Sequence, residues 1–233
     1  MLEDLQLLLQ SLPPEAPQSA YRTLVVEENL LGKSTSKNRS ISFGHLCSLY
    51  SFDPQVPVFR YLRLCQCENP ADLPLLAISL ALARDPLLRL SAAPILALKP
   101  GQAWKRESLS SLLESVFPGR YSDASLKSIA QNLNGSWTQS GHLVGKASKT
   151  RAQVKPGFAA VAYVLFLGWL CGHRSELLLR SPWAKILDLS QDQIKNQLHI
   201  ASQRGLLVYK ESGGLVDLDY SFFLNPAERS LLS

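Results

Sequence analysis

A run of fourteen apolar residues from Phe158 to Cys171, within "GFAAVAYVLFLGWLCG", constrains the fold of this chain more than any other feature. A helix that is apolar on every side has no face to turn to water, so other elements have to cover it. The run is also shorter than the roughly 20 residues that a bilayer-spanning helix needs. The sequence therefore predicts a central helix of a soluble core in a cytoplasmic protein. The first residues, "MLEDLQLLLQSL", agree with this interpretation, because they lack the basic start of an export signal.

The residues before this run have the patterns of helices and few of the patterns of strands. Leucines at helical spacing predict a helix at the start of the chain, and short helices are expected over 42–52 and 57–66. A longer apolar helical stretch over 69–98 is broken near Pro86. We interpret residues 1–104 as a helical N-terminal domain.

From residue 105 onwards the pattern changes. A helix over 107–117 is followed by a turn and a second helix that Ser122 or Asp123 caps. The second helix ends at Gly141, and two short strand-like pieces joined by the basic turn "KASK" come next. Helix, turn, helix and hairpin is the order of a winged helix, so the sequence predicts a first winged-helix-like unit over residues 105–156.

The same order recurs after the apolar run. A helix begins at its cap Ser190 and ends at Gly205, and alternating residues around the turn at 212–214 then predict a β-hairpin. The stretches "SGHLV" and "RGLLV" mark the same step from helix through glycine into strand in both copies. Residues 157–233 are therefore expected to form a second winged-helix-like unit. The predicted fold class is mainly α, a helical N-terminal region followed by two winged-helix-like units with short β-hairpin wings.

The positive charge of the chain is unevenly distributed. The net charge is +5, yet the sequence contains no acidic residue between Asp123 and Glu176. This segment carries six cations, Lys127, Lys146, Lys149, Arg151, Lys155 and Arg174. A basic segment free of acids is typical of a protein that binds a polyanion. A solvated basic face without a partner is the alternative.

The helix before the first hairpin could contact DNA with its outer face. With its apolar stripe turned inward, the helical repeat turns Ser128, Gln131 and Asn132 outward, with Lys127 at the flank. These side-chain types can contact base edges and phosphates in a major groove, although any surface helix has a polar face. The predicted wing adds cations that can lie along a phosphate backbone, namely Lys146, Lys149, Arg151 and Lys155.

The second unit offers a poorer surface for DNA. Lys195 and Asn196 occupy its outer helix face and are candidate DNA contacts. Its hairpin, however, contains Glu211, Asp217 and Asp219 and is acidic on balance. This hairpin is the better candidate for a contact with another protein.

The stretch "GKST" at 32–35 has the ending of a nucleotide-binding P-loop. A P-loop also needs a glycine five residues ahead of the one before the lysine, and Glu27 stands there. The sequence therefore predicts no ATP site. Lys33, Lys37 and Arg39 are interpreted as a small basic segment that can meet phosphate groups.

The sequence contains no recognisable catalytic or metal-binding constellation. The histidines are scattered, and no acid is spaced to orient one of them as a general base. Cys65 and Cys67 form a C-x-C pair, but a zinc site needs a second pair of ligands. We therefore expect reduced thiols, no cofactor, no metal and no enzymatic activity.

Five stretches occur in a characteristic order and spacing, "ENLLGKSTSKNR", "ALARDPLLRL", "SDASLKSIAQNL", "LFLGWLCG" and the ending "SPWAKILDLS…RGLLVY". In this order they resemble the BrxA family of bacteriophage-exclusion (BREX) defence proteins. The resemblance covers roughly residues 25–220 and includes no catalytic residue. It implies a small helical protein with winged-helix parts that binds double-stranded DNA together with other proteins of a defence system.

Two functions are consistent with these features. The first is a non-enzymatic component of an antiphage system that binds double-stranded DNA mainly through its phosphates. The second is a non-catalytic adaptor between proteins, or a transcriptional regulator, built on winged helices. Neither function involves a membrane.

Overall fold

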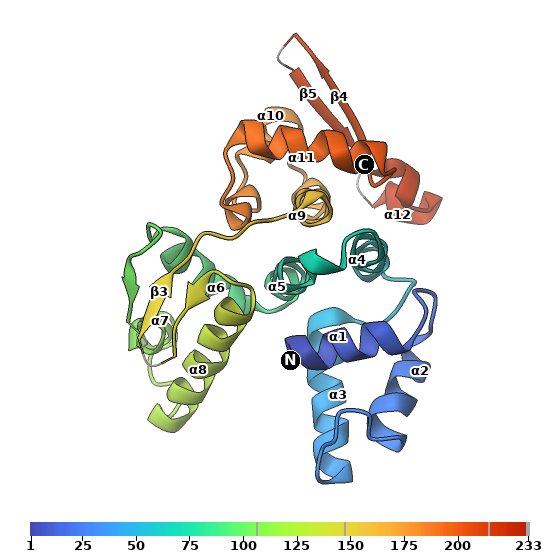
Figure 1. The fold of residues 1–233 in the computed structure, drawn as a ribbon. Helices are drawn as coiled ribbons and strands as arrows, with labels where there is room; N and C mark the ends of the chain where they lie inside the picture. Colours follow the sequence, from blue (N-terminus) through green and yellow to red (C-terminus); the bar gives the residue numbers. More distant parts are fainter. Residues whose placement is uncertain (106, 147, 214, 232–233) are drawn as a thin grey trace. The chain divides into compact units, whose positions relative to one another are not determined.

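The computed structural model describes residues 1–105, 107–146, 148–213 and 215–231. The chain is mainly helical, with two small antiparallel sheets (Figure 1). It forms two compact units. Unit 1 consists of Met1–Leu80 together with Lys155–Ser233, and unit 2 consists of Ala81–Val154.

These units differ from the predicted domain boundaries at 104/105 and 156/157. The N-terminal helices and the predicted second winged-helix-like unit belong to one compact body, because the apolar central helix needs cover from both. Residues 81–104 lie in unit 2, where their helix and strand pack on elements from later in the chain.

The N-terminal part of unit 1 is a set of helices around an aromatic cluster. Its elements are α1 (Leu2–Ser11), α2 (Gln18–Arg22), the π-helix η1 (Thr23–Glu27), α3 (Ser36–Tyr50), α4 (Pro57–Glu68), η2 (Pro70–Asp72) and α5 (Leu73–Arg84), which continues into unit 2. The rings of Tyr21 and Phe52 stack 4.6 Å apart, and Phe59 meets Phe52 at 5.6 Å. The helix predicted over 42–52 begins earlier, at Ser36, because the Thr35 side chain caps it by accepting a hydrogen bond from the Asn38 N–H.

The apolar run forms the central helix of unit 1, as predicted. Helix α9 (Phe158–Leu170) is buried at every residue from Ala159 to Trp169. Helices α4 and α11 (Gln191–Gln203) both pack against it, and Tyr220 donates a hydrogen bond to the Ala162 carbonyl at 3.1 Å. Among the residues described, no helix has both the length and the apolar character needed to cross a membrane.

Asp72, a residue distant in sequence, caps the start of α9. Its two carboxylate oxygens each accept a hydrogen bond at 2.8 Å, one from the Gly157 N–H and one from the Ala160 N–H. Asp72 is 4% exposed, so these N–H groups have little access to water. A β-carbon at Gly157 would lie 2.5 Å from the Asn69 amide, so the approach requires glycine.

Replacing Asp72 by alanine should therefore destabilise unit 1. Two buried N–H groups would lose a charged acceptor, and we expect the free energy of unfolding to fall by about 2–4 kcal/mol. Urea unfolding followed by circular dichroism measures the loss. The exposed Glu68→Ala variant is the control, and an equal unfolding midpoint for the two variants would contradict the assignment of Asp72 as a cap.

The C-terminal part of unit 1 ends in a hairpin. Its remaining elements are α10 (Ser175–Leu179), η3 (Ala184–Leu187), β4 (Val208–Ser212), β5 (Leu215–Asp219), η4 (Ser221–Phe223) and α12 (Pro226–Ser230). The predicted hairpin is confirmed, with antiparallel pairing from Val208↔Asp219 to Ser212↔Leu215. Of its predicted turn at 212–214, Gly214 lies outside the described residues. The predicted cap of α11 is confirmed as well, because Ser190 and Gln193 form a reciprocal capping box.

Unit 2 combines helices with a three-stranded sheet. Its elements are α6 (Pro86–Leu96), β1 (Ala103–Trp104), α7 (Glu107–Val116), α8 (Asp123–Gln139), β2 (Leu143–Val144) and β3 (Lys149–Arg151). The strands are antiparallel in the order β1-β3-β2, and both strands of the predicted hairpin are present. The sequence analysis did not predict β1, which at two residues is too short to show an alternating pattern.

Helix α8 lies at the centre of unit 2 and is anchored by two tryptophans. Its predicted apolar stripe is buried at Leu126, Ala130, Leu133 and Trp137. The indole N–H of Trp137 donates to the Ser91 hydroxyl of α6, and the indole N–H of Trp104 in β1 donates to the Asn134 side-chain oxygen, both at 2.7 Å. These contacts hold α8 against the first helix and the edge strand of the unit.

Candidate nucleic-acid interface

The two units differ in charge. Unit 2 contains ten lysines and arginines against four aspartates and glutamates, a net charge of +6. Unit 1 contains fourteen cationic and fifteen acidic residues, a net charge of −1. The whole positive excess of the chain therefore belongs to unit 2.

The outer face of α8 has the composition that the sequence predicts. Lys127, Ser128, Gln131 and Asn132 are all exposed, one helical turn apart on the side opposite the buried stripe. Lys127 forms no ion pair with any residue that the structure describes. This face presents a lysine, amides and a hydroxyl to solvent, and Figure 1 shows α8 as the longest helix of its unit.

The loop between β2 and β3 adds a second set of groups. Lys146 is exposed at its start. Lys149 is only partly exposed, because its ammonium group donates to the Thr138 hydroxyl at 2.7 Å and to the Gly145 carbonyl at 3.2 Å. Lys149 therefore ties the loop to the last turn of α8.

The prediction that Arg151 is an exposed cation of the wing is wrong. Arg151 is 2% exposed, and its guanidinium donates to the carbonyls of Ile95 (3.2 Å), His142 (3.4 Å) and Ala152. It pairs with the buried Leu143 in the sheet, so the alternation of the strand directs it into the unit rather than towards solvent. There it donates hydrogen bonds to one carbonyl at the end of α6 and to two carbonyls next to the β2–β3 hairpin.

Lys155 is exposed, as predicted, but it does not belong to the wing. It lies four residues after the end of β3 and belongs to unit 1. Of the four cations predicted for the wing, Lys146 and Lys149 are therefore the two that lie in the β2–β3 hairpin and reach its surface.

The basic segment at the start of α3 lies in unit 1 and has internal partners. The Lys33 ammonium is 3.1 Å from an Asp4 carboxylate oxygen, and the Lys33 backbone N–H donates to the Asn29 side chain. Arg39 donates to the Glu27 carbonyl at 3.4 Å, whereas Lys37 is exposed on the first turn of α3. The lysine of "GKST" thus neutralises an acid of α1, a structural role.

We expect no nucleotide binding at this segment. Lys33 is engaged by Asp4, and the backbone lacks the glycine-rich loop that cradles phosphates. Isothermal titration calorimetry with Mg²⁺-ATP should detect no binding, and Lys33→Ala should lower the stability by less than about 1 kcal/mol. A micromolar dissociation constant for ATP would contradict this interpretation.

In unit 1, helix α11 carries the predicted contacts Lys195 and Asn196, and two acidic side chains lie beside Lys195. The Lys195 ammonium lies 2.8 Å from Glu211 of β4 and 4.0 Å from Glu176 of α10. Tyr209 donates to the second oxygen of Glu211 at 2.6 Å. Asn196 is exposed, as predicted. Lys195 is therefore paired within the protein.

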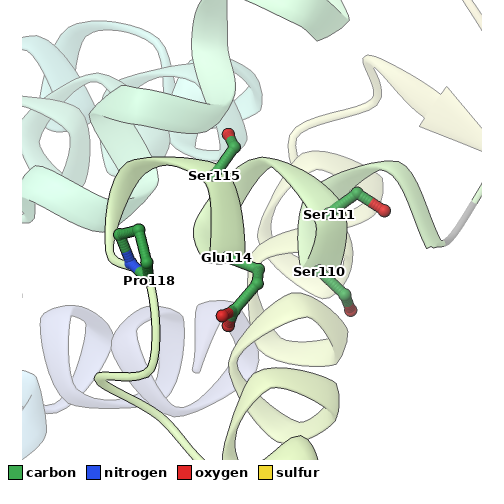
Figure 2. A pocket seen from close by; sticks show the side chains of 5 residues that line it. All are labelled: Ser110, Ser111, Glu114, Ser115 and Pro118. Carbon is green, nitrogen blue, oxygen red and sulfur yellow. The ribbon is translucent and has the colours of Figure 1, made fainter.

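Helix α7 borders a depression on the surface of unit 2. Figure 2 shows its lining, four side chains of α7 and the proline that follows the helix, namely Ser110, Ser111, Glu114, Ser115 and Pro118. Glu114 accepts a hydrogen bond from the Gly119 N–H at 2.9 Å. The lining contains no histidine or lysine that could act as a base for a serine. Among the described residues, no three histidine, cysteine or acidic side chains are grouped so that they could hold a metal ion.

The sequence analysis missed five exposed cations among the described residues of unit 2. They are Arg84, Arg89, Lys99, Lys105 and Arg120. The Arg120 guanidinium stacks on the rings of Phe117 and Tyr121 at 5.4 and 5.6 Å. Arg84, Arg89 and Lys99 were assigned to the N-terminal domain, so their membership of the basic unit was not recognised. A count of charge over 81–154 would have found all five.

Comparisons of the chain with protein-family models, with curated proteins and with solved structures find no match. The candidate interface is therefore assigned only from the geometry and the charge of its own residues. Six of the predicted contacts belong to unit 2 and reach its surface, Lys127, Ser128, Gln131 and Asn132 on one face of α8, and Lys146 and Lys149 in the β2–β3 hairpin. The other predicted DNA contacts belong to unit 1, apart from the buried Arg151.

Proposed function

We propose that unit 2 is a winged-helix module that binds double-stranded DNA. Helix α8 would lie in the major groove, with Gln131 and Asn132 towards the base edges and Lys127 towards a phosphate. The β2–β3 loop, with Lys146 near its tip, would follow the backbone as the wing. The order α6-β1-α7-α8-β2-β3 and the sheet order β1-β3-β2 support this assignment, because a winged helix has this order.

The charge of unit 2 carries the proposal. A net charge of +6 in 74 residues, against −1 in the rest of the chain, favours a polyanionic partner for this unit alone. The attraction between lysine or arginine and a phosphate does not depend on the DNA sequence. We therefore propose binding with little sequence preference, in which phosphate contacts provide the affinity.

The biological role that we propose is a non-enzymatic DNA-binding component of a BREX-type antiphage system. It rests on the resemblance to the BrxA family together with the basic unit. The adaptor function is the second candidate, and the acidic surroundings of Lys195 favour it for unit 1. Both functions can reside in one chain, because unit 2 would hold DNA while unit 1 holds a protein.

Binding of plain duplex DNA is the test. Fluorescence anisotropy with two labelled duplexes of unrelated sequence should give similar dissociation constants at 50 mM salt. With three phosphate contacts, the affinity should fall about 40-fold between 50 and 200 mM salt, because each contact releases counterions. No binding at 50 mM salt, or strong binding to one duplex only, would contradict the proposal.

A further inference from the structure

The outer helices of the two units begin in the same register. Ser122 caps α8 and Ser190 caps α11, and each serine hydroxyl accepts a hydrogen bond from the backbone N–H three residues later. A lysine follows five residues after each cap, Lys127 in α8 and Lys195 in α11. The residue before each lysine, Leu126 or Ile194, is buried, so the two lysines occupy equivalent positions beside the apolar stripe.

The surroundings of these two lysines are opposite. Lys127 is exposed and has no ion pair among the described residues. Lys195 contacts Glu211 at 2.8 Å and Glu176 at 4.0 Å, from the strand after α11 and from the helix before it. Lys195 therefore has a carboxylate partner on each side along the chain, and Glu176 also lies 4.0 Å from the guanidinium of the exposed Arg180.

Further contacts fix Glu211 in this position. Tyr209, two residues earlier on the same face of β4, donates to its second oxygen at 2.6 Å. The Tyr209 ring itself meets His199 of α11 edge-on at 4.7 Å. The hydrogen bond between Lys195 and Glu211 lowers the pKa of Glu211 and raises the pKa of Lys195, so both groups stay charged at neutral pH.

We propose that Glu176 and Glu211 form an acidic clamp that keeps duplex DNA off unit 1. This inference rests on the proposed function, since it explains why only one of two similarly built helices binds DNA. A phosphate that approached α11 would have to displace Glu211 from Lys195, and it would meet both carboxylates within a few ångströms. The clamp therefore acts as a specificity determinant, which leaves the α11–hairpin surface for partners other than nucleic acid.

The test is a gain of DNA binding. In Glu176→Gln/Glu211→Gln, amides of the same shape replace both carboxylates and free Lys195 to contact a phosphate. We expect this variant to bind a plain duplex about three- to tenfold more tightly at 50 mM salt, and its salt slope to steepen by about 0.9. The control Glu15→Gln/Glu68→Gln changes the net charge of unit 1 equally at two exposed residues far from Lys195 in sequence.

A third variant assigns the gain to one residue. Adding Lys195→Ala to Glu176→Gln/Glu211→Gln should return the affinity and the salt slope to those of the unmodified protein. If the clamp variant binds no better than the charge control, or if the gain survives the loss of Lys195, the inference is wrong. If the unmodified protein binds no DNA but the clamp variant does, the proposed function of unit 2 fails and the clamp is supported. If neither binds, both are overturned.

Discussion

Replacing Arg151 by methionine is expected to lower the stability of unit 2 by about 3–5 kcal/mol, because the change removes the buried hydrogen bonds from the guanidinium to the carbonyls of Ile95, His142 and Ala152. Methionine approximates the length of the arginine stem, so the loss reports mainly the missing hydrogen bonds. Arg151→Lys should recover little of it, since one ammonium group cannot replace a planar fork of donors. This is the largest effect that we expect from any single substitution in the unit.

Hydrogen–deuterium exchange measured by mass spectrometry can localise this loss. Peptides from residues 81–154 should exchange faster in Arg151→Met, whereas peptides from unit 1 should be unchanged. The exposed Lys146→Met is the matched control, and its effect should stay within about 0.5 kcal/mol. Equal exchange in the two variants would mean that the burial of Arg151 is not important for the fold.

The second large effect concerns DNA affinity. The pair Lys127→Ala/Lys146→Ala removes one exposed cation from α8 and one from the β2–β3 loop. Two lost phosphate contacts should reduce the salt slope by about 1.8 and weaken binding roughly 10- to 100-fold at 50 mM salt. The weakening should be the same for duplexes of unrelated sequence, because phosphates carry no sequence information.

Anisotropy titrations of this pair need a control for folding. Both lysines are exposed and make no contact that caps a helix, so the melting temperature should stay within the error of the unmodified protein. An unchanged salt slope in a folded variant would exclude this face from the DNA interface.

Several parts of the fold could be predicted because their signals are local. The caps Ser122 and Ser190 lie within three residues of the groups they bind, and both helices were predicted from them. The apolar run before Cys171 was predicted as a core helix because no part of it can face water. The exposed face of α8 follows from the helical repeat alone, and the structure agrees there residue by residue.

The failures arise where distant residues decide the outcome. The sequence assigned Arg151 to a basic hairpin, yet its partner Ile95 lies 56 residues away, and a three-residue strand is too short to show which side faces inward. The ion pairs of Lys195 could not be predicted for the same reason, because Glu176 precedes it and Glu211 follows it at a distance in the sequence. Charge in the sequence is therefore a poor guide to free charge on the surface until the internal partners are known.

The most direct test of the central claim compares the salt slopes of two paired variants on one duplex. Lys127→Ala/Lys146→Ala removes cations from unit 2, and Lys195→Ala/Arg204→Ala removes the same number from unit 1. The account predicts that the slope falls by about 1.8 for the first pair and stays unchanged for the second. A larger fall for the second pair, at equal melting temperatures, would show that the DNA face lies on α11 and would contradict the assignment of DNA binding to unit 2.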